Sequence, residues 1–442
     1  MSASRTSCRA AIVAALFVCA AWRSAGAQDA APANGTLPGG VVYELRPDAA
    51  QSAAAVALWY RAPAGGFDGT ALPGLSRLAA ATVAASTPVT GTSLAQLVDR
   101  WGGRLSVAAY ADSVSVTVLV APDHVARAVR ALTADYFAPV ITAEGLRVAQ
   151  RDSTEDAIYR SLAPDAIEDA LGAALFASGP LHDGAIGNPD GLANAKLERV
   201  RAFADRAFRP GNAILVLTGN VDATALSNVA ARAGATPASA LPEPAAAQAP
   251  RPDGAPLNRE GDFAGTGLGW LGPPIADEAA ATALDFVADA LFVPKRGIVA
   301  KALGSRKAVV TGKFVTYRNP GVFLVTISGD EADAARPLVD KALADAAKPM
   351  SPALFAVARA AFVYRLLGDM ETPTEISDTY GWYAVEGAPA YAPAEGGMRG
   401  RYFTLAAQLT PASVAQAVAT FLGRPPAVVT VVKRALRPRT QT

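Results

Sequence analysis

The chain has 442 residues, of which 51% are hydrophobic and 18% charged, a composition that fits a packed globular protein of roughly two to four domains and excludes a largely disordered one. Its formal net charge is +1, from 40 basic and 39 acidic residues. Because this balance provides no excess of basic residues to bind phosphates, we expect no nucleic-acid partner.

The first 27 residues have the pattern of a secretory signal peptide. Arg5 and Arg9 precede an apolar run over residues 10–21, and residues 25–27 (AGA) form a small-residue cleavage site. The run is too short to remain in a bilayer, and no later segment reaches the roughly 18 apolar residues that a spanning helix needs. We therefore expect an exported, periplasmic protein that has no membrane contact after signal cleavage.

Cys8 and Cys19 are the only cysteines, and both lie within the expected signal peptide. A lipoprotein signal around Cys19 is the competing interpretation, but the bulky Val18 directly before it favours an ordinary signal peptide. The mature chain would then be free of disulfides, which is more typical of a bacterial periplasmic protein than of a small extracellular domain.

The first half of the mature chain, residues 28–234, mixes two periodicities. Segments that alternate like half-buried strands lie at residues 40–46 and 54–62, and further strands are predicted at residues 213–220 and as a pair within 104–121. Segments in which apolar residues recur every three or four positions predict helices at residues 72–85, 93–101, 122–136, 143–171 and 197–208.

Residues 235–256 contain six prolines and many alanines, which predicts an extended linker. Residues 257–433 then repeat the order of the first half, with a strand at 265–272, a helix at 279–291, a strand pair within 308–328 and a final strand at 427–433. Helices are predicted at 352–367 and 371–387 as well, and residues 434–442 form a basic tail. Such duplication predicts two domains of like α+β fold, each a mainly antiparallel sheet with helices packed on it.

Residues 74–81 (GLSRLAAA) begin the helix expected at 72–85. Arg77, Ala80 and Ala81 are spaced i, i+3 and i+4, so they share one helix face. The segment resembles the inverted zinc motif, H-x-x-E-H, of the pitrilysin/insulinase family of metallopeptidases, the inverzincins. The resemblance implies that Arg77 and Ala81 replace the two zinc-binding His residues and that Ala80 replaces the general-base Glu. Since none of the three can bind zinc or activate water, the chain is identified as a noncatalytic, half-length bacterial member with no catalytic residues at this motif.

The same resemblance gives a role to the strand after Gly102. In the family this strand begins G-G-x-x-N-A, lines the cleft and pairs with the backbone of the peptide substrate. Gly102, Gly103 and the later Asp112 match the pattern, whereas Ser106 occupies the Asn position. An unpaired edge strand can hold extended peptides of many sequences. The expected substrate-binding residues are Gly103, Arg104, Leu105, Ser106 and Val107.

The third zinc ligand of the family is a Glu, which the local pattern places at Glu155 or Asp156. Without other ligands, this carboxylate would stand alone opposite Arg77. Two interpretations remain open at this point: a salt bridge to Arg77, or a solvated helix face.

His124 and His182 are the only histidines. We expect both to be structural, because His124 begins a helix and His182 lies in a turn that resembles a family turn whose His is not a metal ligand. A displaced metal site would need both to converge with a carboxylate, whereas catalytic zinc sites usually place two ligands a turn apart on one element. We therefore expect no cofactor in this chain and zinc in a catalytic partner.

In the second half, the resemblance places the substrate-binding Arg and Tyr of the family at Gly304 and Thr311, and neither residue matches. The neighbouring Arg306 and Lys307 are interpreted as solvated turn charges. An aromatic cluster in the helix expected at residues 371–387 is interpreted as core rather than as a binding patch.

These features favour the inactive subunit of an exported, heterodimeric zinc peptidase. Its catalytic partner would carry an intact H-x-x-E-H motif, and the two chains together would form a cavity for unfolded peptides. A freestanding peptide-binding or chaperone-like homodimer is the alternative, and an active metallopeptidase with a displaced metal site is a third possibility.

Overall fold

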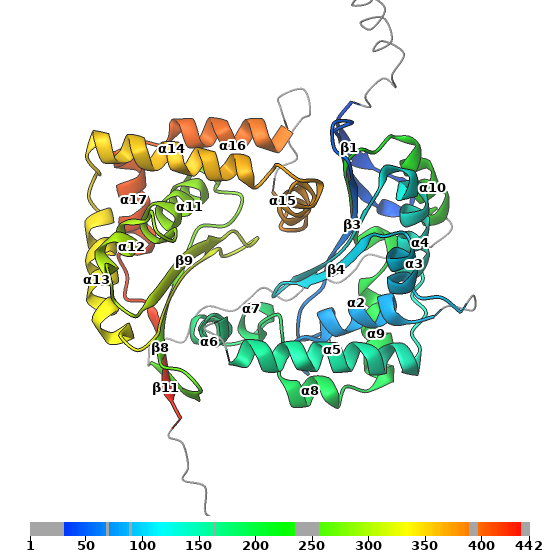
Figure 1. The fold of residues 1–442 in the computed structure, drawn as a ribbon, viewed down its shortest axis with the longest axis horizontal. Coiled ribbons are helices and arrows are strands. Elements are labelled where there is room, and N and C mark those ends of the chain that lie inside the picture. Colours follow the sequence, from blue (N-terminus) through cyan, green and yellow to red (C-terminus); the bar gives the residue numbers. More distant parts are fainter. Residues whose placement is uncertain are drawn as a thin grey trace, which may run out of the picture.

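The computed structural model describes residues 31–67, 70–87, 91–162, 165–234, 256–388 and 397–434. Within them the chain forms two α+β halves, each built on one sheet, and Figure 1 shows the halves side by side with most helices on the outer sides of the sheets. The predicted fold class is thereby confirmed. The expected signal peptide, nearly all of the expected linker and most of the expected tail lie outside the described residues. No helix in the described part is both long and apolar enough to cross a membrane.

The first sheet has six strands in the order β1-β2-β6-β3-β5-β4. β3 (Ala54–Arg61) lies centrally, antiparallel to β5 (Ser113–Val120) and β6 (Ala213–Gly219), and is almost completely buried. β2 (Val42–Pro47) runs parallel to β6. The edges are β1 (Ala33–Thr36), paired with β2, and β4 (Arg104–Ala109), paired with β5. β1 was not predicted, because its four residues (ANGT) show no apolar alternation.

One face of this sheet is covered by helices whose apolar stripes join it in a single core. The helix expected at residues 72–85 is α2 (Leu75–Ala85), which starts after Gly74 at φ 84°, where a Cβ would overlap the carbonyl of Ile186. The other helices of this half are α3 (Leu94–Arg100), α4 (Val125–Phe137), α5 (Ala143–Ser161), α7 (Pro180–Asp183), α8 (Pro189–Ala193), α9 (Leu197–Ala207) and α10 (Thr224–Ala233), with 3-10 turns η1 (Pro38–Gly40), η2 (Pro122–His124) and η3 (Pro210–Asn212).

The second sheet repeats the first. Its order is β7-β11-β8-β10-β9, which corresponds strand for strand to β2-β6-β3-β5-β4, and the parallel pair β7–β11 is the counterpart of β2–β6. The predicted duplication is therefore confirmed. The strands are β7 (Leu257–Gly261), β8 (Gly265–Leu271), β9 (Val309–Val315), β10 (Val322–Ser328) and β11 (Ala427–Lys433).

Most helices of the second half pack against one face of this sheet and form a separate core with it. They are α11 (Glu278–Phe292), α12 (Ile298–Leu303), α13 (Ala332–Ala346), α14 (Pro352–Gly368), α16 (Gly397–Gln408) and α17 (Pro411–Phe421).

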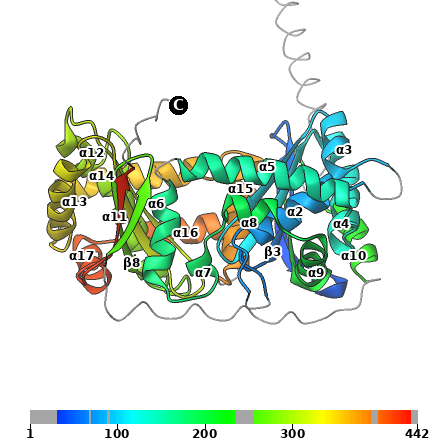
Figure 2. The ribbon, with the colours of Figure 1, turned by 90° about the horizontal axis from the view of Figure 1, so that it is seen from below.

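Each half also lends one helix to the other. α6 (Asp165–Leu175) belongs to the first half in sequence but packs on β8 and β11, and α15 (Pro373–Val385) comes from the second half but packs on β3 and β6. Figures 1 and 2 show α6 against the second half and α15 beside β3. The prediction of one continuous helix over residues 143–171 was wrong. α5 ends at Ser161 and α6 begins separately at Asp165, and the intervening Pro164 has no N–H to donate to a helix.

Glycines make the close packing of α6 possible. Gly265, Gly267 and Gly269 occupy alternate positions of β8 and therefore point to one face of the sheet. A Cβ at Gly265 would lie 2.7 Å from Ile167, a Cβ at Gly267 would overlap Ile167, and a Cβ at Gly269 would lie 2.9 Å from Leu175. The side chains of α6 thus occupy the space that β8 leaves free, and the two halves interlock.

Candidate functional site

The face of α2 that resembles the zinc motif is closed by an ion pair. Arg77 Nη2 lies 2.7 Å from Asp156 Oδ2 on α5, with side-chain exposures of 22% and 42%. Glu155 is exposed to solvent. The salt-bridge interpretation is thereby confirmed, and Asp156, not Glu155, is the residue that pairs.

The other two motif positions leave little room for a metal site. Ala80 is completely buried, and its carbonyl accepts a hydrogen bond of 2.6 Å from the hydroxyl of Tyr136. Ala81 is partly buried and packs against the same core. A zinc ion needs three or four N, O or S ligands, and this face offers a guanidinium, two methyl groups and one carboxylate. The residues present therefore do not fit zinc.

The two histidines occupy separate elements. The ring of His124, in η2, stacks on Trp101 with centroids 5.9 Å apart. His182, in α7, has its Nδ1 3.0 Å from Asp183 Oδ1. Among the described residues there is no group of three or more His, Cys, Asp or Glu that could hold a metal ion.

The strand expected to bind substrate is an edge strand. β4 contains Arg104 to Ala109 and pairs with β5 alone, and Gly103 directly precedes it. The Tyr110 N–H donates to the Ser113 carbonyl, so Tyr110 and every second residue before it in β4 are the ones hydrogen-bonded to β5. In an antiparallel pair the hydrogen-bonded residues alternate, so Leu105, Val107 and Ala109 direct their backbone N–H and C=O groups towards the free edge.

A cavity lies where the two halves meet at the end of this edge. Its volume is about 270 Å³, and it is lined by the last residue of β4, Ala109, and the last residue of β9, Val315. Figure 1 shows these two strands approaching each other in the middle of the molecule. The lining also includes residues of α5, α6, the α7 region, the turn after β4, β9 and the segment after it, and β10. Sequence patterns contain no direct signal for this cavity, because α6 was not expected to pack on the second half.

Charged groups of both signs line this cavity. Lys313 Nζ on β9 forms a 2.5 Å ion pair with Glu168 Oε2 on α6. Asp169 and Arg160 also line the cavity. Burial raises the pKa of Asp169 to about 6, against the opposing effect of the nearby Arg160.

The residues of the second half that were considered for substrate binding are dispersed. Gly304 ends α12 at φ 58°, and Thr311 lies on the edge strand β9, where its hydroxyl is 2.7 Å from that of Thr326. Arg306 and Lys307 are exposed in the turn between these elements, as predicted, and Arg306 donates to the Ala302 carbonyl.

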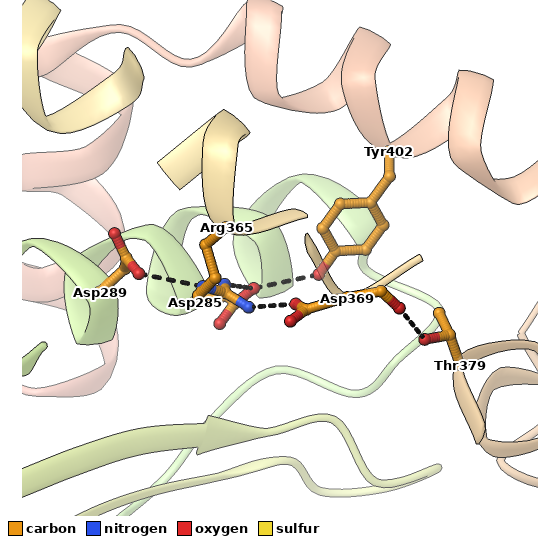
Figure 3. A network of polar contacts seen from close by, with 6 residues as sticks. All are labelled: Asp285, Asp289, Arg365, Asp369, Thr379 and Tyr402. Atoms are coloured by element: carbon orange, nitrogen blue, oxygen red, sulfur yellow. Dashed lines mark hydrogen bonds and ion pairs between the residues drawn. The ribbon is translucent and has the colours of Figure 1, made fainter. Parts of the chain in front are cut away.

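A second cavity of about 270 Å³ lies beside α15 and is lined by Asp378, Trp382, Tyr383 and a polar network centred on Arg365. Figure 3 shows the Arg365 guanidinium among three carboxylates: it lies 2.8 Å from Asp285, 2.9 Å from Asp289 and 2.6 Å from Asp369. The Tyr402 hydroxyl donates to the same Asp285 Oδ2. Sequence reasoning missed this network, because its members are distant in the chain and follow no motif.

The expected core role of the aromatic cluster on α15 is supported by its surroundings. Tyr380 is buried against Trp59 and neighbouring residues of the first sheet. Trp382 and Tyr383 pack partly against the same cluster.

Asp112, which matches the family pattern after β4, lies at the junction of the halves. Its carboxyl group hydrogen-bonds the carboxyl group of Glu386, the C-cap of α15, which is only 1% exposed. The Arg318 backbone N–H donates to Glu386 Oε2 at 2.8 Å. Burial and the adjacent Asp112 raise the pKa of Glu386 to about 9. Two carboxyl groups can share a hydrogen bond only if one is protonated, so this pair holds a proton at neutral pH.

Comparison with known proteins agrees with this architecture. Residues 194–362 match the family model of the peptidase M16 inactive domain. No curated protein sequence matches the chain.

Solved structures with a similar fold include a protease from Helicobacter pylori, which is 15% identical with a TM-score of 0.79 over 92% of this chain and 100% of that one. A peptidase M16 inactive domain from Pseudomonas fluorescens is 16% identical, with a TM-score of 0.75 over 92% and 100%. A putative M16-like peptidase from Alicyclobacillus acidocaldarius is 16% identical, with a TM-score of 0.72 over 91% and 98%. These matches bear out the resemblance to the pitrilysin/insulinase family, M16: residues 194–362 match the inactive domain of peptidase M16, the fold is that of M16-like structures, and the chain lacks the H-x-x-E-H motif.

Proposed function

We propose that this protein is exported to the periplasm, binds unfolded peptides and acts as the inactive subunit of a heterodimeric zinc peptidase. The partner chain would carry an intact H-x-x-E-H motif and supply the zinc-dependent hydrolysis. This chain would supply part of the wall of the peptide-binding cavity.

The free edge of β4 is the observation that carries the peptide-binding part of the proposal. Leu105, Val107 and Ala109 direct unpaired backbone groups to this edge. An extended peptide that lies beside β4 can satisfy these donors and acceptors whatever its side chains are, because the added ladder consists of main-chain hydrogen bonds. An unfolded segment fits this requirement, whereas a folded protein has already paired its own backbone.

The chemistry of α2 supports a noncatalytic role. Hydrolysis by the family mechanism requires a metal-bound water and a carboxylate base, and Arg77, Ala80 and Ala81 provide neither. Export is supported by the pattern of residues 1–27, with a basic start, an apolar run and a small-residue cleavage site.

A substitution on β4 tests peptide binding. Val107→Pro removes the outward N–H and leaves the hydrogen bonds between β4 and β5 intact, since proline is tolerated on an edge strand when its missing donor faces away from the ladder. The matched control Val107→Ala loses more of the side chain but keeps the N–H. We expect fluorescence anisotropy to show at least about a tenfold weaker peptide affinity for the proline variant and little change for the alanine variant, because several main-chain hydrogen bonds depend on this register. Equal affinities would contradict binding at this edge.

Co-purification tests the subunit role. The tagged mature chain, from Gln28 onward, is isolated from an extract of its own cells and assayed for bound zinc and for peptide hydrolysis that a chelator inhibits. We expect a second chain with an intact H-x-x-E-H motif, and activity that follows it. A chain that elutes alone, metal-free and inert, but still binds peptides, would instead establish the alternative of a peptide-binding homodimer or monomer.

A further inference from the structure

The cavity between the halves has an apolar floor. Leu175 and Phe176, at the end of α6, and Val322 and Leu324, on β10, line it and are at most 9% exposed, and Leu181 is buried beside them. Its volume of about 270 Å³ exceeds the roughly 150 Å³ of an apolar cavity that is known to hold a benzene molecule. It is nevertheless smaller than pockets that enclose a whole drug-sized ligand, about 300 to 1,000 Å³. The cavity therefore has the size for one large side chain.

The charges that line the cavity compensate one another. Lys313 pairs with Glu168 across the junction of the halves. Arg160 and Asp169 add one charge of each sign. With two cations and two carboxylates, the lining gives no net attraction for a charged side chain, and a charged group placed against the apolar residues would lose its hydration without a partner. An uncharged apolar side chain is the occupant that this chemistry favours.

The position of the cavity connects it to the free edge of β4. Ala109 both lines the cavity and directs its backbone groups to that edge. A peptide paired with β4 would therefore reach the cavity at the Ala109 end of the strand. Because successive side chains of an extended peptide point to opposite faces, one residue at that end would enter the cavity, and its two neighbours would point away.

We propose that the cavity between Ala109 and Val315 is a specificity subsite that receives one large apolar side chain, such as Phe or Leu, of a peptide paired with β4. This inference rests on the proposed peptide binding, and it adds a sequence preference that main-chain pairing alone does not give. The preference is for an unfolded segment with an aromatic or aliphatic anchor at one position.

A guest–host peptide series tests the preference with the full mature chain. The host is an extended, polar peptide labelled with a fluorophore, and Phe, Leu, Ser, Lys or Glu is placed at each position in turn. We expect one position at which Phe and Leu bind about 10- to 100-fold more tightly than Ser, as for full burial of a large apolar side chain, while Lys and Glu bind no better than Ser. At the adjacent positions the preference should vanish.

Two matched variants locate the subsite. Val315→Phe extends a larger side chain into the cavity and should reduce the Phe-over-Ser preference to less than about threefold, because the filled space can no longer bury a guest side chain. Val309→Phe is the control: Val309 is 59% exposed, lies on the same face of β9 and is six residues, about 20 Å, from Val315. The control should keep the wild-type preference. Circular dichroism melts show whether each variant folds.

The outcomes separate the two proposals. If no peptide in the series binds, the proposed function fails and the subsite falls with it. If peptides bind but no position prefers Phe and Leu, or if Lys or Glu is preferred, the subsite is overturned and peptide binding stands. The subsite is also overturned if Val315→Phe folds and keeps the full preference. Should Val315→Phe fail to fold, the wild-type guest series alone decides.

Discussion

Gly381 lies where α15 packs closely on the first sheet, and adding one methyl group there tests the interlock of the two halves. A Cβ at this position would overlap the indole of Trp59. Trp59 is completely buried and stacks on Tyr110 with ring centroids 5.5 Å apart. The indole therefore cannot move aside, and Gly381→Ala must displace α15 from the sheet.

The expected size of the effect follows from two opposing terms. Overpacking a buried site costs about 1–3 kcal/mol, whereas replacing a helical glycine by alanine stabilises a helix by about 1 kcal/mol at most. We expect a net loss of about 1–2 kcal/mol in the free energy of unfolding, and thus a melting temperature lower by roughly 2–8 °C at about 2–4 °C per kcal/mol.

The control and the readout are straightforward. Gly368→Ala, at the last residue of α14, meets no neighbour within 4 Å of the added Cβ and should leave stability unchanged or slightly raised. Differential scanning calorimetry measures both variants, and near-ultraviolet circular dichroism reports on the packing of Trp59. If Gly381→Ala is as stable as Gly368→Ala, α15 is not held tightly against the first sheet, and the account of the interlock is wrong.

Three further predictions concern the charged groups. The raised pKa of Glu386 makes the native state bind more protons than the unfolded state between about pH 4.5 and 9. The free energy of unfolding should therefore fall as pH rises through this window, by at most about 1.4 kcal/mol per pH unit. Glu386→Gln should flatten this dependence in urea unfolding between pH 7 and 9, and an unchanged slope would contradict the shared proton. Arg365→Met leaves several carboxylates unpaired and should lower the free energy of unfolding by about 2–4 kcal/mol, less than for a fully buried pair because the Arg365 side chain is 29% exposed. Arg365→Lys, which lacks the planar guanidinium, should recover less than half of that free energy in the same assay. A double-mutant cycle of Arg77→Ala and Asp156→Ala should give a coupling of about 0.5 kcal/mol, as for partly exposed pairs, and a value above 2 kcal/mol would show that the pair is effectively buried.

The sheets were predictable from the sequence because their strands carry strong local patterns. Residues 54–62 and 213–220 are rich in apolar residues, and the strands β3 and β6 begin at the predicted residues and end one residue earlier than predicted. The duplication was visible for the same reason, since both halves place these patterns in the same order. β1 escaped prediction because four residues without apolar alternation gain their structure only from pairing with β2.

The exchange of helices could not be predicted, because it depends on contacts between distant segments. The periodicity of residues 143–171 continues across the break, so it gives no sign that α6 packs on the second sheet. The alternating glycines of β8 are visible in the sequence, but their meaning depends on the side chains of α6 that face them. The cavity between the halves was missed for the same reason.

The candidate site combines features that the local sequence indicates with features that depend on contacts between distant segments. The replacement of the motif at Arg77 is visible in the sequence, and the family resemblance offered a salt bridge to Glu155 or Asp156 as one of two interpretations, which the ion pair with Asp156 decides. The partner of Asp112 was hidden, because Glu386 reaches it only through the packing of α15. The family pattern thus located Asp112 but gave no indication of its proton-sharing contact.

The duplication gives the degenerate motif a structural explanation. In the first half, α2 and α5 are joined by Arg77 and Asp156, and in the second half the corresponding α11 and α14 are joined by Asp285 and Arg365, with the charges reversed. Both halves therefore have an ion pair between the same two helices. A metal ion at this site would place a second cation beside Arg77, and the two would repel each other at short range. The Arg77 guanidinium thus provides the cation that pairs with Asp156. Restoring metal ligands at Ala80 and Ala81 alone would leave this cation in the site.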